Sequence, residues 1–136
     1  MDKSNFNMID FAIIELNYSA KNSKLNFEDA VSNIEAQAGV KENDGKLYGK
    51  LKIHVVLSFE DGSEFNCTSE SLFFMEHSKN DSENDKNDFM ELIKLNGAIH
   101  SLSLLRDQLH MITLLIGAKG AYILPFINLN DSEWKK

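Results

Sequence analysis

The sequence has few residues that cross-link or stiffen a chain: its 136 residues include one cysteine and one proline. A single cysteine, Cys67, cannot form an internal disulfide, and no Cys-x-x-Cys pair is present to suggest a zinc knuckle. A chain of this length can bury a hydrophobic core without a disulfide or a bound metal ion. We therefore expect a single domain over residues 1–136 that needs no cofactor.

Basic residues and long apolar runs are also scarce. The chain has 14 Lys and Arg against 21 Asp and Glu, a formal net charge of −7, and its basic residues are scattered singly. A nucleic-acid surface needs clustered basic side chains, so nucleic acid is a poor partner. The most apolar window, residues 109–127, is interrupted by His110 and Lys119, and no basic-then-apolar signal peptide begins the chain. The sequence predicts a soluble cytoplasmic protein without membrane insertion.

Neither catalysis nor metal binding is predicted. His100 and His110 are ten residues apart in a helical segment and so lie on different faces, whereas zinc pairs on a helix are three or four residues apart. Ser101, Ser103 and Asp107 lie nearby, but the chain has no Gly-x-Ser-x-Gly turn. We expect a binding protein, not an enzyme, with no catalytic and no metal-ligating residues.

Four segments have the pattern of strands. Residues 6–18 are apolar on both parities, as in a strand that is buried on both faces. In residues 25–40 the apolar parity switches, which predicts a β-bulge, while helical steps from Phe27 to Ile34 leave a short helix as the alternative. Residues 47–59 and 65–75 alternate cleanly around an Asp61-Gly62 turn. Because nothing helical separates the four segments, the sheet should be antiparallel.

The second half of the chain is expected to be helical. We expect strands in residues 1–77, a mobile acidic linker in 78–88, and a helical part in 89–136 that begins with a short helix capped by Asn87 or Asp88. A long amphipathic helix follows and ends near Gly117 or Gly120. Its apolar positions recur at steps of three and four: Ile99, Leu102, Leu105, Leu109, Ile112 and Ile116, widened by Leu104, Met111 and Leu115. The stripe is wide enough to face two partners at once.

These elements together predict an α+β fold. It consists of a four-stranded antiparallel sheet, a meander, followed by a long helix packed on one face and a short C-terminal helix.

Two short segments carry a family resemblance. Residues 101–106 read Ser-Leu-Ser-Leu-Leu-Arg, and nineteen residues after Arg106 come Pro125 and the sequence Phe-Ile-Asn-Leu. They are similar to the Leu-Phe-Pro-Tyr-x-Arg type segment and the Pro-[Val/Ile]-Asn-Phe type segment of the SecB export-chaperone family, with Ser103 in place of the helix proline. The resemblance covers about residues 47–130, and the first two strands agree by pattern.

The resemblance implies a holdase that binds unfolded polypeptide or preprotein clients in an apolar groove without ATP. It also implies a homotetramer, built as a dimer of dimers with the long helices in the interface. It leaves open whether clients are exported, which would engage an export motor ATPase, or belong to one dedicated system such as a toxin–antitoxin pair. The alternative is a non-chaperone oligomeric protein that binds a small apolar ligand or a single folded partner.

Two sets of residues are predicted to carry this function. The client-binding residues are Phe73, Phe74, Met75, Ile123, Leu124 and Phe126. The oligomer-interface residues are Leu102, Leu105, Leu109 and Ile112. Phe74 is the informative member, because its parity directs it away from the face of Phe73 and Met75. The competing interpretation is that these side chains belong to the core.

Overall fold

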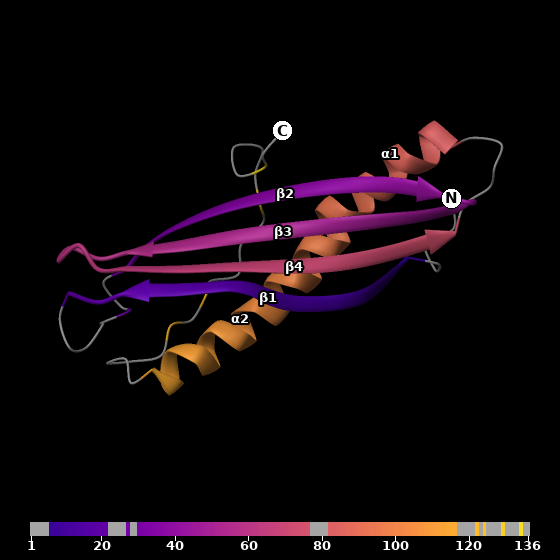
Figure 1. Cartoon of the computed structure of the whole chain (residues 1–136). Coiled ribbons are helices and arrows are strands. Elements are labelled where there is room, and N and C mark those ends of the chain that lie inside the picture. Colours follow the sequence, from indigo (N-terminus) through magenta and orange to yellow (C-terminus); the bar gives the residue numbers. More distant parts are fainter. Residues whose placement is uncertain are drawn as a thin grey trace.

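The sheet has four strands of thirteen residues each. The computed structural model describes residues 6–21, 27, 30–76, 82–116, 122, 124, 129 and 134. The strands are β1 (Asn7–Ser19), β2 (Val31–Asn43), β3 (Lys46–Ser58) and β4 (Glu64–Glu76). Their order in the sheet is β1-β4-β3-β2, and all neighbours are antiparallel (Figure 1). The predicted antiparallel meander is confirmed. Strand β1 pairs with the side of β4 that β3 does not cover.

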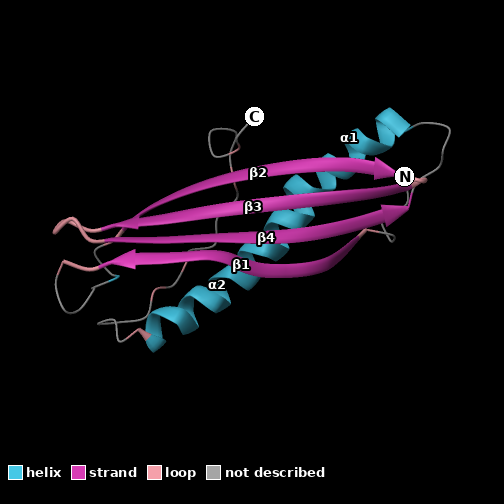
Figure 2. Ribbon diagram, in the orientation of Figure 1, coloured by secondary structure: helices cyan, strands magenta, loops and turns pink. Residues whose placement is uncertain are grey.

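A nearly continuous helix crosses one face of this sheet diagonally (Figure 2). It consists of α1 (Ser82–Leu92), a π-helical turn (Ile93–Gly97) and α2 (Ala98–Leu115). The α+β class is therefore confirmed. The expected glycine stop and the short C-terminal helix fall almost wholly outside the described residues.

The expected acidic linker is wrong from Ser82 onward, because α1 begins there and Asn87 and Asp88 lie inside it. The packing of Phe89, which follows this polar stretch, explains why the stretch is helical. Phe89 is fully buried against the sheet, and the Lys86 ammonium lies 4.0 Å from a carboxylate oxygen of Glu42 on β2. Packing thus extends the helix toward its N-terminus through residues that have little apolar surface of their own.

Tight turns set the register of β2, β3 and β4. Asp44 and Gly45 both have positive φ, 52° and 74°, which is the geometry of a two-residue type I′ hairpin turn. Gly62 has a φ of 87° in the turn between β3 and β4, where its N–H donates to the carbonyl of Phe59. The sequence predicted the turn at Asp61-Gly62.

The core lies between the helix and one face of the sheet. Alternate residues of β3 and β4 are buried there, including Leu51, Ile53, Phe65 and Phe73. Their neighbours of opposite parity form the open face of the sheet. A sheet covered on one side is the usual reason for this alternation.

Strand β1 also turns one face toward the core, but two bulges interrupt its alternation. Its pairing with β4 shifts between Met8 and Asp10 and again between Ile13 and Glu15, so Ile9 and Ile14 are extra residues in two bulges. Each bulge reverses the parity of the residues that follow it. The first strand is therefore not buried on both faces: its mixed parity reflects one inward face interrupted twice.

The bulge expected in the second strand is wrong. The pairing of β2 with β3 runs without a shift from Val31 to Asn43, and Phe27 lies outside β2. The parity switch marks the place where the strand begins. Phe27 instead packs its ring against Phe59 and Phe65 at centroid distances of 5.4 and 5.6 Å.

Small residues allow the helix to approach the sheet closely. A Cβ on Gly97 would lie 2.9 Å from the ring of Phe73, and a Cβ on Gly49 would lie 2.3 Å from the end of the Ile93 side chain. Beside them the hydroxyls of Ser71 on β4 and Ser101 on α2 share a buried hydrogen bond of 2.7 Å. The crossing is therefore fixed by close packing and one polar tie.

Candidate polypeptide-binding surfaces

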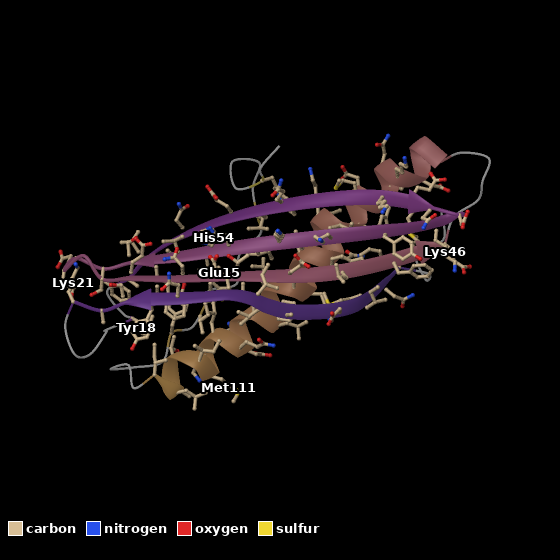
Figure 3. All side chains as sticks on the ribbon, in the orientation of Figure 1. Glu15, Tyr18, Lys21, Lys46, His54 and Met111 are labelled. Carbon is tan, nitrogen blue, oxygen red and sulfur yellow. The ribbon has the colours of Figure 1, made fainter. Side chains whose placement is uncertain are left out.

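Most of the large apolar side chains that are exposed in the described part of the chain lie in two regions. On β1 they are Ile9, Ile14, Leu16 and Tyr18, and on the helix they are Leu95, Ile99, Met111, Leu114 and Leu115. Figure 3 places Tyr18 and Met111 toward the same end of the molecule in that view. Exposed apolar patches of this kind mark interaction surfaces on globular proteins.

The outer face of the helix carries these residues as an ordered ridge. At steps of four it presents Leu95, Ile99, Ser103, Asp107, Met111 and Leu115, all of them exposed. Ile99 and Met111 are 59% and 62% exposed. Two apolar residues at each end therefore flank a polar centre. Rows of this spacing are the ridges that pack against a second helix.

The β1 surface is apolar for a different reason. Leu16 and Tyr18 have the inward parity, pairing with Cys67 and Phe65 of β4, yet they are 47% and 45% exposed. Ile9 and Ile14 are exposed because they are the extra residues of the two bulges. This edge of the sheet is thus left partly uncovered by the chain's own helix.

The open face of the sheet is largely polar. Lys50 and Lys52 of β3 flank Glu70 of β4, with nitrogen–oxygen distances of 3.9 and 4.0 Å. Glu15 and His54 lie in the middle of this face (Figure 3). Exposed ion pairs at these distances contribute little to stability, so this face has the character of a solvated surface.

Among the predicted client-binding residues, Phe74 lies on this open face. Its ring centroid is 5.5 Å from that of Tyr48, and both side chains are accessible at least in part. Phe73 and Met75 lie on the opposite face and are buried. The opposite parity of Phe74 is therefore confirmed, while its role in binding a client stays a prediction.

The remaining client-binding predictions fall near the end of the helix. Leu124 is buried, at 1% exposure, and Ile123 and Phe126 lie outside the described residues. The buried side chains have little surface for a client while the chain keeps this packing.

The predicted interface residues lie on the inner side of the helix. Leu102, Leu105 and Leu109 are buried against the sheet, and Ile112 is partly buried. A side chain without exposed surface has none to offer a second chain. The outer ridge through Ile99 and Met111 is the exposed apolar surface of the helix. The width of the apolar stripe in the sequence indicated that the helix has such a second apolar side.

Thr113 joins the end of the helix to the segment that follows. Its hydroxyl donates to the carbonyl of Leu109 at 2.9 Å and accepts from the buried N–H of Tyr122 at 2.8 Å. Burial raises the pKa of the Tyr122 phenol, whose side chain also hydrogen-bonds Ser32 on β2. One threonine therefore helps to connect the helix, residue 122 and the edge of the sheet.

Replacing Thr113 with valine should lower the free energy of unfolding by about 1–3 kcal/mol, because the buried amide of Tyr122 loses its acceptor while the side-chain volume is kept. Urea denaturation measures the change. Thr113→Ser, which keeps the hydroxyl, is the control and should lose much less. Equal stabilities of the valine variant and the wild type would contradict this account.

The Cys67 thiol lies in the core of the described chain. Burial, and secondarily the charge of Glu15, raises the pKa of the Cys67 thiol to about 11, so the reactive thiolate is scarce near neutral pH. In the part of the chain that the structure describes, no group of three His, Cys, Asp or Glu side chains is placed to hold a metal ion. Within the described helices, no stretch combines the length and hydropathy that a membrane crossing requires.

Comparisons with known proteins give structural similarity only. No family model matches the sequence, and no curated protein matches it significantly. A SecB-like chaperone of Mycobacterium tuberculosis, solved with a ChAD peptide from the HigA1 antitoxin, matches with a TM-score of 0.65 at 8% identity, covering 91% of each chain. A protein of unknown function from Streptococcus agalactiae matches with a TM-score of 0.56 at 15% identity, covering 89% of this chain and 97% of the other. The chain therefore shares its fold with a SecB-like chaperone.

Proposed function

We propose that this protein is a SecB-like holdase, which binds unfolded polypeptide segments without ATP and without a catalytic step. The observation that carries the proposal is the set of large apolar side chains left exposed on β1 and on the outer helix of a fold shared with a SecB-like chaperone. Promiscuous binding of polypeptides relies on such adaptable apolar surface. A cytoplasmic location fits this role.

The outer ridge of the helix supports self-association. The ridge reads alike from either end: Ile99 and Met111 lie six residues before and after Leu105, and Leu95 and Leu115 lie ten residues before and after it. Two copies packed antiparallel would bring Ile99 of one copy near Met111 of the other. Ser103 would then lie near the partner copy's Asp107, whose carboxylate can accept a hydrogen bond from the serine hydroxyl. Such a self-complementary surface is what a two-fold dimer requires.

The exposed residues of β1 provide a second surface. Two different self-complementary contacts on one chain produce a dimer of dimers. We therefore assign the homotetramer to these two surfaces, the helical ridge and the β1 edge. The apolar side chains of β1 and of the helix that assembly leaves uncovered then remain available to clients.

The experiment that tests the function is the solution mass by light scattering, with and without reduced, carboxymethylated lactalbumin, a permanently unfolded chain. We expect a tetramer that takes up the unfolded chain and slows aggregation of a denatured enzyme. Native lactalbumin, with its disulfides intact, is the matched control and should not bind. If the protein neither binds the unfolded chain nor slows aggregation, the holdase proposal fails.

Client range decides between general and dedicated chaperones. A general holdase should bind unrelated unfolded chains with similar affinity, whereas a chaperone dedicated to one system, such as an antitoxin, should strongly prefer its own client. The antitoxin peptide bound by the Mycobacterium neighbour makes a dedicated client worth testing. Binding of a small apolar ligand or one folded partner, with no affinity for unfolded chains, would instead support the non-chaperone alternative.

A further inference from the structure

Strand β2 is an edge strand that no bulge or proline interrupts. It pairs only with β3 among the four strands, and its thirteen pairs run from Val31 to Asn43 without a bulge or a proline. Bulges and prolines are common devices that prevent edge strands from pairing with other chains. The opposite edge, β1, has two bulges. The two edges of the sheet therefore differ in their readiness to accept another strand.

The hairpin turn determines which backbone groups of β2 point away from β3. In a two-residue hairpin the residues next to the turn, here Asn43 and Lys46, form a hydrogen-bonded pair, and such pairs alternate along the ladder. Ala36 and Ala38 fall in the other class of pair. Their backbone N–H and C=O groups consequently point away from β3, toward the free side of the edge.

Trp134 already occupies part of this edge. It forms an isolated parallel β-bridge with Ala36, and its partly buried side chain packs against the core. Bridge partners place their side chains on the same face of a sheet, and Ala36 is buried on the helix-covered face. The Lys94 ammonium, on the π-helical turn, lies 5.4 Å from the centroid of the indole ring. The indole therefore sits between the β2 edge and the helix.

We call the place that the indole occupies, between Ala36 on β2 and Lys94 on the helix, the seat. Its surroundings determine which kind of segment fits it. The small side chain of Ala36 leaves room for a large neighbour. The backbone groups of β2 that point away from β3 suit an extended chain. The cation of Lys94 favours an aromatic ring. A segment that satisfies all three conditions is extended and carries an aromatic residue. The chain fills the seat with a residue of its own that meets this description.

We propose that Trp134 is an internal stand-in for the client: an extended polypeptide segment with an aromatic side chain adds to the β2 edge and displaces Trp134 from its seat. This inference rests on the proposed holdase function and names the class of segment it binds. Displacement is feasible because Trp134 holds the edge through an isolated bridge and a cation–π contact. A longer client segment would form additional ladder hydrogen bonds along β2.

Trp134 is the only tryptophan in the chain, so its emission reports the seat directly. The probe is a Trp-free peptide of alternating threonine and valine with one central phenylalanine and lysines at both ends. A peptide with serine in place of that phenylalanine is the control. Saturation with the phenylalanine peptide should shift the Trp134 emission to longer wavelength, and the serine peptide should bind much more weakly.

Variants test the competition between Trp134 and the client. Trp134→Ala should bind the labelled phenylalanine peptide about five- to tenfold more tightly in fluorescence anisotropy, because the seat is no longer occupied most of the time. Trp134→Phe keeps an aromatic side chain and should bind with nearly the affinity of the wild type. Lys94→Ala in the Trp134→Ala background should weaken peptide binding about twofold, because Lys94 then contacts only the aromatic ring of the peptide.

Four results would overturn the inference. Peptide binding without an emission change, or equal or weaker binding by Trp134→Ala, would mean that Trp134 does not compete with the client, while uptake of unfolded lactalbumin would still support the holdase. A rise in solution mass of Trp134→Ala with a loss of peptide binding would assign the edge to a second copy. Failure of the wild type to bind either the peptide or unfolded lactalbumin would remove both proposals.

Discussion

Replacing Ile99 with aspartate should halve the solution mass of the protein. In the antiparallel arrangement each Ile99 lies near Met111 of the partner copy, so every helix pair would have to bury two new carboxylates against apolar side chains. Burying an unpaired charge costs several kcal/mol, which at two symmetric positions exceeds what a contact of this size can offset. The subunit itself should remain folded, because Ile99 is 59% exposed in the single chain.

A charge pair should restore the assembly. Met111→Lys alone should also halve the mass, but combined with Ile99→Asp it would place opposite charges together at both ends of the contact. The double variant should recover the original mass at low salt and lose it as salt is raised. Gln37→Asp, on the exposed face of β2, is the control and should leave the mass unchanged. An unchanged mass for Ile99→Asp, or a dissociated but folded double variant, would exclude the antiparallel register.

Replacing Gly49 with alanine should lower the free energy of unfolding by about 1–3 kcal/mol, the usual cost of overpacking a core. The new methyl group would lie 2.3 Å from the end of the Ile93 side chain and 2.9 Å from the ring of Phe89. Ile93 can turn away, but the buried ring of Phe89 has less freedom, so the helix must move off the sheet. Chemical denaturation followed by circular dichroism measures the loss.

Gly39→Ala is the matched control, because Gly39 also lies within a strand of the same sheet. A Cβ at Gly39 meets no atom within 4 Å, so alanine should be neutral or stabilise the protein by a few tenths of a kcal/mol through the unfolded state. If both alanine variants are equally stable, close packing at Gly49 does not fix the position of the helix.

The strands could be predicted from the sequence where the alternation of apolar and polar residues was uninterrupted. In β3 and β4 the inward parity continues from the first residue to the last, so alternation identified both the strands and their buried face. In β1 two bulges reverse the parity, and the pattern then resembles a strand buried on both sides. Nothing within a single strand distinguishes these cases, because the position of a bulge depends on the partner strand.

The helix was predicted well in its centre and poorly at its start. The apolar periodicity that identifies α2 is absent from residues 82–88, which are helical because the buried ring of Phe89 anchors the following turn to the sheet. The same limitation applies to the candidate site. The width of the apolar stripe indicated two partners for the helix, but only the structure shows that Leu105 is buried and that Ile99 and Met111 are exposed.

The strand order has a consequence for the order of folding. β1 pairs only with β4 among the strands, joining Asn7 to Phe74 and Ser19 to Glu64, so the first strand to be synthesised is among the last to find its place. The two hairpins of β2, β3 and β4 close locally and can form earlier, since short loops close fastest. Until β4 is complete, the isoleucines of β1 remain exposed on the growing chain, where they are open to aggregation. A protein that we propose protects unfinished chains is therefore, during its own synthesis, a chain in need of such protection.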